Sequence, residues 1–411
     1  MDFERLSALY GGKCQAEAQI KRFDALKAEF AKRFGSSDNL ELISAPGRTE
    51  IIGNHTDHNK GEVMAASVDM DTVAAVRANG TNTVTLYSDL YDEPFTVSLD
   101  TLEPAIAEKE TTFALIRGVA AGLKQHSYKI GGFDAVVTSN VLRGSGLSSS
   151  AAFEVLIASI FDALFNGWTI PAPFKAQIGQ YAENVFFMKP CGLMDQMASA
   201  VGGLVHIDFA SDEAVVEALK FDFAAHGLSA CVVAVGGEHG NLTAEYAAIP
   251  AEMKQVAKCL GAETLRSVQD KIASSLPQLK NKVSDRAIMR ALHFADENAR
   301  VGKMVNAVKA NDLEAVLDCI IKSGESSWKL LQNLCVPGSS NQEMPLALEM
   351  SRRMLEGKGA WRIHGGGFAG TILAFVPAEM MGNYTKAMED VFGKGSVRPL
   401  FIRPEGTVWL K

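Results

Sequence analysis

The clearest pattern in the sequence is an apolar stripe at helical spacing near the start of the chain. Five apolar residues of segment 16–34 fall on one face of a helix, and Gly35 follows the last of them. These residues are Ile20, Phe23, Leu26, Phe30 and Phe34. An apolar period of about 3.6 residues that stops at a glycine predicts an amphipathic helix over 16–34.

Strand-like and helix-like patterns alternate along the rest of the chain. The predicted strands are 40–45, 63–78, 83–88, 133–141, 204–209, 231–235 and 361–377, the last broken by glycines at 365–367. The further predicted helices are 111–124, 153–165, 174–187 and most of 251–356. We expect the first strand to end at Pro46-Gly47. This mixed order predicts an α+β protein in two lobes, which we divide into domains 1–210 and 211–411.

The composition excludes several classes of protein. The chain has 411 residues, a hydrophobic content of 47%, a charged content of 21% and a net charge of −8. This acidic balance gives no electrostatic footprint for nucleic acid or an anionic membrane, and no apolar run reaches the length of a membrane span. The N-terminus lacks the basic and apolar regions of a secretory signal. The cysteines form no Cys-x-x-Cys pair, so we expect a cytoplasmic enzyme with reduced thiols.

A glycine- and serine-rich stretch, Gly144-Ser-Gly-Leu-Ser-Ser-Ser-Ala-Ala152, leads into the apolar run 153–165. Glycines allow backbone N–H groups to turn inward, and serine hydroxyls add donors and acceptors. The N-terminus of the following helix attracts anions. Strand, loop and helix in this order predict a cradle for a polyphosphate. The alternative is an ordinary polar loop that ends in an N-cap serine.

A second polar cluster lies between two predicted strands, in residues 48–58. It contains Arg48, Glu50, Asn54, His55, Asp57 and His58. Such side chains suit a polyhydroxylated ligand, because each hydroxyl of the ligand both donates and accepts hydrogen bonds. His55, Asp57 and His58 could instead bind a metal ion, although no later His or Cys cluster completes the set. A capping and turn network is the third interpretation.

Two carboxylates and a glycine triplet complete the candidate chemistry. Glu183 lies on a predicted helix, and Asp195 follows a Pro-Cys-Gly turn among apolar neighbours, which indicates a partly buried carboxylate. Phosphoryl transfer needs one carboxylate to hold Mg²⁺ and another near the attacking hydroxyl. The glycines 365–367 allow close approach of the backbone to a ligand, and a flexible hinge is the alternative.

Four motifs together resemble the galactokinase family. Residues 45–59 (APGRTEIIGNHTDHN) are similar to that family's PGRVNLIGEHTDYN signature, and residues 144–152 match its phosphate loop. Residues 191–196 (CGLMDQ) resemble its CGIMDQ, and residues 365–370 (GGGFAG) its third motif. The resemblance covers nearly the whole chain. It implies a two-lobed α+β small-molecule kinase fold, with an N-terminal mixed-sheet domain and a C-terminal ferredoxin-like α/β sandwich, as in the galacto-, homoserine, mevalonate and phosphomevalonate kinase superfamily.

The resemblance also implies an activity, which is ATP-dependent phosphorylation of a monosaccharide at its anomeric (C1) hydroxyl, giving sugar 1-phosphate and ADP. Asp195 would be the base, Arg48 would stabilise the transferring phosphoryl group, and Ser150 with Glu183 would bind Mg²⁺. The implied sugar contacts are Glu50, Asn54, His55, Thr56, Asp57 and Tyr246. The implied ATP contacts are Ser88, Gly144, Ser145, Gly146, Leu147, Ser148, Ser149 and Ser150. The expected partners are the sugar and ATP, with the chain a monomer or a weak homodimer.

Three of the chain's departures from the family signature bear on the choice of sugar. Glu50 stands where the family has Asn, Asn54 where it has Glu, and His58 where it has Tyr. That Glu usually holds the 6-hydroxyl of galactose, so a neutral Asn54 beside His58 would tolerate an anionic group at C6, and galacturonate is an alternative substrate. The other interpretation is that Glu50 and Asn54 have exchanged roles in one network. A non-catalytic sugar sensor on the same fold is a further alternative, against which the intact serine loop argues.

Overall fold

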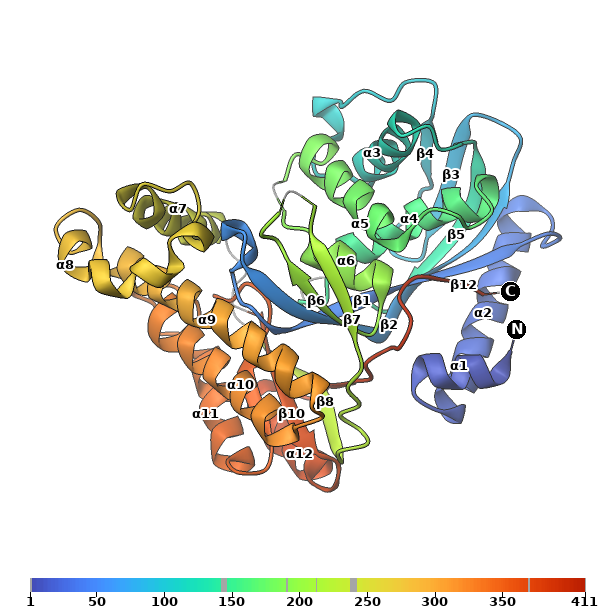
Figure 1. Cartoon of the computed structure of the whole chain (residues 1–411). Helices are drawn as coiled ribbons and strands as arrows, with labels where there is room; N and C mark the ends of the chain where they lie inside the picture. The colour runs from blue at the N-terminus through green and yellow to red at the C-terminus, as the bar shows by residue number, and fades with distance from the viewer. Residues whose placement is uncertain are drawn as a thin grey trace.

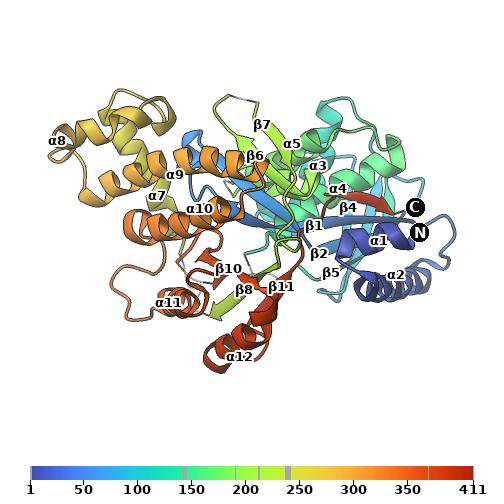
Figure 2. The same cartoon turned by 60° about the horizontal axis from the view of Figure 1, so that its bottom comes forward.

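The computed structural model describes residues 2–141, 146–189, 191–211, 213–236, 242–368 and 370–410. Gly144 and Ser145 of the predicted phosphate loop therefore lie outside the described residues. Two sheets organise the chain, and both termini lie beside the larger one in Figure 1 and in Figure 2. Among the described residues, no helix combines the length and the apolar character needed to cross a membrane.

The larger sheet is mixed and has eight strands in the described part of the chain. They are β1 (Glu41–Ile52), β2 (Glu62–Ala78), β3 (Thr83–Ser88), β4 (Phe95–Ser98), β5 (Phe133–Ser139), β6 (Leu204–Asp208), β7 (Val215–Leu219) and β12 (Val408–Leu410). Their order is β12-β1-β2-β5-β3-β4, with β6 on β2 and β7 on β6. The β3–β5 pair is parallel, whereas β1 and β2 pair antiparallel. The mixed N-terminal sheet predicted from the sequence is therefore confirmed.

Helices cover both faces of the larger sheet (Figure 1). They are α1 (Phe3–Tyr10), α2 (Lys13–Phe34), α3 (Thr112–Gln125), α4 (Ser149–Phe165), α5 (Ala172–Tyr181) and α6 (Met194–Val201). In β1, Leu42 packs with the α1 and α2 residues, whereas the next residue, Ile43, packs with those of α3 and α4. Successive side chains of a strand point to opposite faces, so a sheet that is covered on both sides needs the nearly continuous apolar runs seen in the sequence.

The smaller sheet is antiparallel, in the order β11-β8-β10-β9. Its strands are β8 (Leu228–Gly236), β9 (Ala360–Ile363), β10 (Gly370–Pro377) and β11 (Val397–Leu400). Between β8 and β9 the chain forms α7 (Thr243–Cys259), α8 (Leu276–Leu279), α9 (Asp285–Lys309), α10 (Leu313–Ser326) and α11 (Glu343–Leu355), and α12 (Met381–Phe392) joins β10 to β11. This β-α-β-β-α-β order is ferredoxin-like, which confirms the predicted α+β fold.

The chain crosses between the two sheets twice. It leaves the larger sheet after β7 and returns to it with β12 at the C-terminus. Both strands lie in the part of the chain that the division at residue 210 assigns to the second domain. The division into 1–210 and 211–411 itself stays a prediction.

The strand β1 continues beyond its predicted end, so the expectation that it stops at Pro46-Gly47 is wrong. Register shifts between Pro46 and Arg48 and between Glu50 and Ile52 mark bulges in its pairing with β2. A bulge accommodates proline, which has no N–H for the ladder. It also lets the Arg48 N–H donate to the carbonyl oxygen of Leu147 at 3.0 Å. Local composition favours a turn at Pro-Gly, and the pairing with β2 overrides it.

The predicted helix 174–187 is divided in the structure. The α-helix α5 ends at Tyr181, and a π-helical segment, Ala182–Phe186, follows and contains Glu183. A π-helical turn has one more residue than an α-helical turn and is frequent at functional sites. A second π-helical segment, Ser327–Leu331, follows α10. Hydrophobic periodicity does not distinguish these segments from an α-helix.

Asp71 of β2 joins the N-terminal helices to the returning C-terminal segment. Its buried carboxylate accepts hydrogen bonds from Tyr10, Arg22 and Ser44, each at 2.5 Å, and lies 3.3 Å from the guanidinium of Arg403. Burial would raise the pKa of Asp71, but the charges of Arg22 and Arg403 outweigh it and hold that pKa below its ordinary value.

We expect Asp71→Asn to lower the free energy of unfolding by about 3 kcal/mol, because it leaves the fully buried Arg403 without a charged partner. The depressed pKa means that the stability from Asp71 is lost as the pH falls through its folded-state pKa. Urea unfolding at neutral pH measures the change. The control is Asp24→Asn, since Asp24 is 66% exposed. A loss below about 1 kcal/mol would contradict this role for Asp71.

Candidate functional site

The centre of the candidate site is an ion pair between Arg48 of β1 and Asp195 of α6. The Arg48 Nε and Nη2 atoms donate to the two carboxylate oxygens of Asp195, each over 2.7 Å. The remaining nitrogen, Nη1, donates to the carbonyl oxygen of Gly146. The structure therefore brings the first polar motif, the end of the serine loop and Asp195 together in one place.

Asp195 is held ionised and still has room for a ligand. Burial would raise the pKa of Asp195, but the charge of Arg48 and hydrogen bonds from Arg48 and Ser148 outweigh it and hold the pKa below its ordinary value. Its side chain is 31% exposed, whereas that of Arg48 is 8% exposed. A carboxylate has about four acceptor positions, of which Arg48 and Ser148 occupy three. One position is left for a hydroxyl of a ligand.

The turn at Ser148, called the serine turn below, places the N-terminus of α4 beside Asp195. Ser148 has left-handed backbone angles, φ 57° and ψ 65°, directly before α4 begins. Its hydroxyl donates to Asp195 Oδ2. Ser149 and Ser150 are partly exposed in the first turn of α4, whereas Leu147 is fully buried. Because the first N–H groups of a helix have no partner within the helix, this N-terminus suits an anionic ligand.

A cluster of buried polar groups lies next to Asp195. The Gln196 amide donates to Glu154 Oε2 at 2.9 Å and to Glu183 Oε2 at 3.0 Å. Burial raises the pKa of both glutamates, and for Glu154 the nearby charge of Glu183 raises it further. Glu154 follows Ser150 by one turn of α4, so the two side chains lie on the same face of that helix.

This cluster has the chemistry of a site for a divalent cation. Glu154 Oε1 and Gln196 Oε1 are buried and have no hydrogen-bond partner among the described residues. Carboxylate, amide and hydroxyl oxygens are the ligands that Mg²⁺ prefers. A cation held near Ser150 and Glu183 would favour the ionised form of these two buried carboxyl groups. The residues present therefore fit the metal that the sequence implied.

The polar turn at residues 53–57 lies against the short segment 191–193, which directly precedes α6 and its Asp195. A Cβ atom on Gly192 would collide with Asp57 Oδ2, so only glycine allows this close approach. The other carboxylate oxygen of Asp57 accepts a hydrogen bond from the backbone N–H of His58 at 2.9 Å. Asp57 therefore lies against the segment that leads into Asp195.

His55 is a partly buried, neutral imidazole, and one of its two ring nitrogens is unused. Burial and the neighbouring His58 lower the pKa of His55 to about 4. Its Nε2 atom lies 3.0 Å from the carbonyl oxygen of Gly366, and its Nδ1 atom has no partner among the described residues. Because a carbonyl only accepts, Nε2 must carry the proton and Nδ1 is a free acceptor. The side chain of His58 is 38% exposed.

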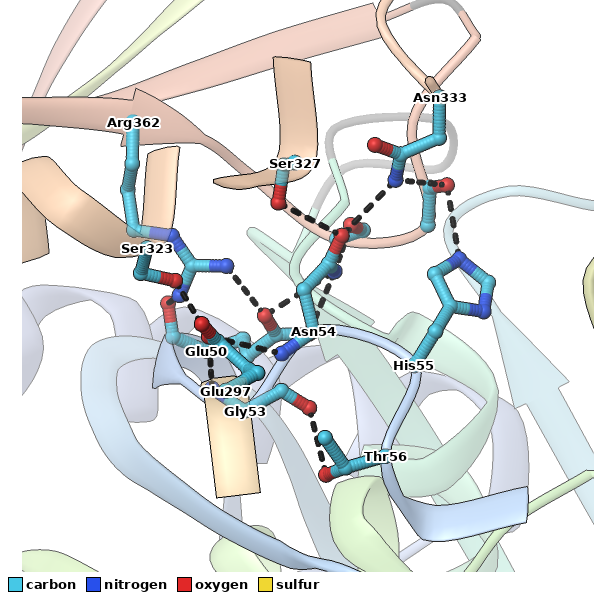
Figure 3. Close-up of polar contacts among 12 residues, drawn as sticks. Glu50, Gly53, Asn54, His55, Thr56, Glu297, Ser323, Ser327, Asn333 and Arg362 are labelled. Carbon is cyan, nitrogen blue, oxygen red and sulfur yellow. Dashed lines mark hydrogen bonds and ion pairs between the residues drawn. The ribbon is translucent and has the colours of Figure 1, made fainter. Parts of the chain in front are cut away.

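Three other predicted sugar contacts, Glu50, Asn54 and Thr56, are buried in the protein (Figure 3). Glu50 pairs with Arg362 at 2.6 Å. Asn54 bonds to Glu50 and to residues of the C-terminal domain. The Thr56 hydroxyl lies within hydrogen-bond distance of the backbone carbonyls of Gly53 and Glu62. In this conformation all three side chains bond to protein groups.

The two remaining predicted contacts are Tyr246, for the sugar, and Ser88, for ATP. The hydroxyl of Tyr246 donates to the carbonyl oxygen of Gly367 at 2.8 Å, which places this α7 residue against the glycine-rich loop. Ser88 ends β3 and lines a cavity of about 290 Å³ between α2 and β5, together with Arg22, Tyr87 and Thr138. The described contacts do not link Ser88 to Asp195, and its role in ATP binding stays a prediction.

The metal interpretation of His55, Asp57 and His58 finds no support in the described residues. There, no group of three or more His, Cys, Asp and Glu side chains is arranged to hold a metal ion. His55 and His58 have tilted rings with centroids 5.9 Å apart, and His55 uses Nε2 for Gly366.

Sequence reasoning missed several residues that build the site. Gln196 lies inside the motif 191–196, and Arg362 and His364 lie just before the glycine triplet, but their roles depend on partners distant in the sequence. His364 contacts Thr371 at 2.9 Å and lies against Gly146. Asn333 and Glu297 belong to no motif, and both contact the turn that contains Asn54. For these two, the sequence contains no local indication.

Two family models match the N-terminal half of the chain. Residues 28–78 match the galactokinase galactose-binding signature, and residues 114–203 match the GHMP kinases N terminal domain. The chain is 30% identical over 362 residues to the galactokinase of Streptomyces coelicolor, covering 86% of this chain and 89% of that protein. It is also 30% identical over 336 residues to the galactokinase of Pyrococcus furiosus, covering 81% and 88%.

Solved structures share the fold. Lactococcus lactis galactokinase complexed with galactose superposes with a TM-score of 0.83 at 23% identity, covering 94% of this chain and 100% of that one. Methanococcus jannaschii mevalonate kinase superposes with a TM-score of 0.61 at 14% identity, covering 90% and 98%. Both likenesses support the two-lobed architecture described above.

Proposed function

The chain belongs to the galactokinase family, and from this premise we propose that its sugar substrate is galactose. The protein is an ATP-dependent sugar kinase, which transfers a phosphoryl group from ATP to the C1 hydroxyl of a monosaccharide and releases ADP. The observation that carries the proposal is the contact of Asp195 with both Arg48 and the serine turn. A carboxylate for the sugar hydroxyl and an anion site for the nucleotide thus lie side by side.

We propose that Asp195 is the base of the reaction. As the C1 oxygen forms its bond to the γ-phosphorus, the bond from that phosphorus to ADP breaks, and the hydroxyl proton passes to Asp195. The low pKa of Asp195 makes it a weak base that is ionised at neutral pH. Such a base suits a loose transition state, in which positioning and charge stabilisation supply most of the catalysis.

Arg48 has donors left for the transferring phosphoryl group. A guanidinium carries five N–H donors, and three of them bond to Asp195 and Gly146. The other two can meet the phosphoryl oxygens, on which negative charge accumulates. We propose that the backbone of 144–150 holds the nucleotide phosphates, and that His55, Asp57 and Tyr246 contact the sugar.

Mg²⁺ is the proposed metal cofactor, held by Ser150 and Glu183. When bound, the cation neutralises charge on the nucleotide phosphates. We expect Glu183→Gln to raise the Mg²⁺ concentration needed for half-maximal rate by about 10- to 100-fold. Titrating Mg²⁺ at fixed ATP measures this, and Mn²⁺ binding followed by electron paramagnetic resonance gives a reading without turnover. The control is Glu263→Gln, an exposed residue. An unchanged Mg²⁺ requirement would contradict the assignment.

Gly146 tests the proposed nucleotide loop. A Cβ atom there would lie 2.8 Å from His364 Nδ1 and 3.0 Å from Thr371 Oγ1, and its φ of +73° disfavours any other residue. We expect Gly146→Ala to raise the KM for ATP at least about tenfold, because the loop must move away from His364 and Thr371. Gly302→Ala is the control, since nothing lies within 4 Å of that position. A KM for ATP within twofold of wild type would contradict this role.

A hexuronate such as galacturonate is the second candidate substrate. The favouring observation is that Glu50 is neutralised inside the protein by Arg362 and that residue 54 is a neutral amide. An anionic sugar would therefore meet no free carboxylate from residues 50 and 54. An enzyme distinguishes two such sugars by a difference in binding free energy of a few kcal/mol. One hydrogen-bond partner can supply that difference.

A panel of hexoses and uronic acids, assayed with ATP and Mg²⁺ for ADP release, tests the proposal. We expect sugar-dependent ADP release with galactose, and a galacturonate rate above the galactose rate would favour the second candidate. A sugar sensor on the same fold would bind sugar without releasing ADP. Absence of sugar-dependent ADP release across the whole panel would contradict a kinase function.

A further inference from the structure

Asn54 uses its whole hydrogen-bonding capacity inside the protein (Figure 3). The side chain is 0% exposed. Its amide nitrogen donates to Glu50 at 3.1 Å and to the Gly365 carbonyl at 2.8 Å, and its oxygen accepts from Asn333 at 2.8 Å and Ser327 at 3.3 Å. A side-chain amide has two donors and two acceptor positions. Asn54 therefore offers nothing further to a ligand.

At one end of this network is a buried ion pair. Arg362 is 0% exposed and Glu50 is 3% exposed. Arg362 Nη2 donates to Glu50 Oε1 at 2.6 Å, and Nη1 donates to the backbone carbonyl of Glu50 at 3.3 Å. Each charge needs the other, because an unpaired charge in the interior is costly. Glu297, which is also buried, already adds a second carboxylate to this region, so the neutral amide of Asn54 avoids a third.

At the other end, Asn333 connects Asn54 to His55. Its amide nitrogen donates to Asn54 Oδ1 at 2.8 Å and to the Gly366 carbonyl at 3.0 Å. The same carbonyl receives His55 Nε2 at 3.0 Å. Figure 3 shows Asn333 and His55 approaching this oxygen from different elements. The position of one carbonyl therefore decides where the His55 ring is held.

We propose that Glu50, Asn54, Asn333 and Arg362 form a positioning unit, here called the clamp, for His55. The clamp fixes the Gly366 carbonyl, and this carbonyl fixes His55 as the Nε2–H tautomer. Nδ1 is then the acceptor for a sugar hydroxyl. This inference rests on the proposed function in one respect, the contact of His55 with sugar. Its consequence is that residues 50 and 54 affect sugar binding through His55 rather than by touching the sugar.

Asn333→Asp tests the clamp with a side chain of the same size. Aspartate has no N–H, so the bonds to Asn54 and Gly366 are lost and two oxygens face each other. We expect the KM for sugar to rise about 10- to 100-fold, with the KM for ATP and the kcat at saturating sugar within about threefold of wild type. The ¹⁵N shifts of the His55 imidazole are expected to leave the values of a pure Nε2–H tautomer.

The matched control is Asn298→Asp. Asn298 is also buried, at 4% exposure, and it bonds to Glu62, Arg266 and Gln269, outside the clamp. Thermal unfolding of both variants reports any general loss of stability. The clamp requires that the sugar KM and the His55 spectrum change for Asn333→Asp and stay unchanged for Asn298→Asp. An unchanged sugar KM and His55 spectrum in Asn333→Asp would overturn the proposal.

If Asn333→Asp does not fold, exchanging the carboxylate and the amide between positions 50 and 54 gives a second test. Glu50→Gln leaves Arg362 unpaired, and Asn54→Asp sets two carboxylates side by side. The double variant returns one carboxylate and one amide beside Arg362, so we expect its sugar KM to lie closer to wild type than that of either single variant. If the change in sugar KM of the double variant equals the product of the two single-variant changes, the two residues act independently and the clamp is overturned.

The two hypotheses fail in different ways. The tautomer of His55 is measured without any substrate, so it decides the clamp whichever sugar the enzyme uses. If wild-type protein shows no sugar-dependent ADP release, the proposed function fails. If wild type turns over sugar and its His55 carries the proton on Nδ1, the clamp is wrong and the function stands.

Discussion

Replacing Asp195 by Asn is expected to lower kcat by about 10⁴-fold while the protein folds and binds nucleotide normally. Asn has the same size and retains one oxygen for the Arg48 guanidinium, which donates two bonds of 2.7 Å in the wild type. It cannot take up the proton of the sugar hydroxyl. A coupled assay of ADP release measures kcat, and calorimetry with ADP measures binding.

Asp270→Asn is the control, because Asp270 is exposed. It should leave kcat unchanged. If Asp195→Asn keeps a kcat within tenfold of wild type, another group is the base. If it loses nucleotide binding together with activity, Asp195 supports the serine turn and has no separate catalytic role.

Replacing Arg48 by Ala is expected to lower kcat by about 10³- to 10⁵-fold, the range known for arginines that stabilise a transferring phosphoryl group. The substitution removes charge from the reacting phosphate and also leaves the Asp195 carboxylate without its partner. Arg48→Lys retains the charge but loses the paired geometry, so it should fall between Ala and wild type. Steady-state kinetics with both substrates saturating measures the three proteins.

The pH dependence of Arg48→Ala gives an independent reading. In the wild type, activity requires ionised Asp195 and falls as the pH drops through its depressed pKa. Removing Arg48 raises that pKa, so the acidic limb of the rate profile is expected to move to higher pH. A limb that stays in place or moves to lower pH would show that Arg48 does not set the ionisation of Asp195.

Local patterns in the sequence predicted the main parts of the site. The serine loop before an apolar helix, the polar run from Arg48 and the carboxylate at Asp195 each have a composition that suits their chemistry, and the structure places them in contact. The amphipathic helix 16–34 is found as α2, from Lys13 to Phe34. Each of these features is decided by residues close together in the chain.

Other features depend on contacts that no local pattern encodes. The strand β1 continues through Pro46 because β2 pairs with it on both sides of the bulge. The π-helical turn that contains Glu183 has the same apolar pattern as an α-helix. Asn333 contacts Asn54 across 279 positions of sequence, so only the folded chain reveals that it belongs to the site.

The clamp also explains the exchange at positions 50 and 54. The carboxylate at Glu50 is needed by Arg362, and the amide at Asn54 is needed because it must donate to Gly365 and accept from Asn333. A glutamate at 54 would lack the donor and add a further buried charge beside Glu50 and Glu297. In the clamp the two residues act as one network, and the sugar contacts that we propose are His55, Asp57 and Tyr246.

The most direct test of the account is a crystal structure with bound galactose and a non-hydrolysable ATP analogue. We expect the C1 oxygen of the sugar to lie within about 3 Å of the Asp195 carboxylate, with the terminal phosphate between that oxygen and the serine turn at Ser148. A sugar bound with C1 turned away from Asp195, or a nucleotide bound away from the N-terminus of α4, would contradict it.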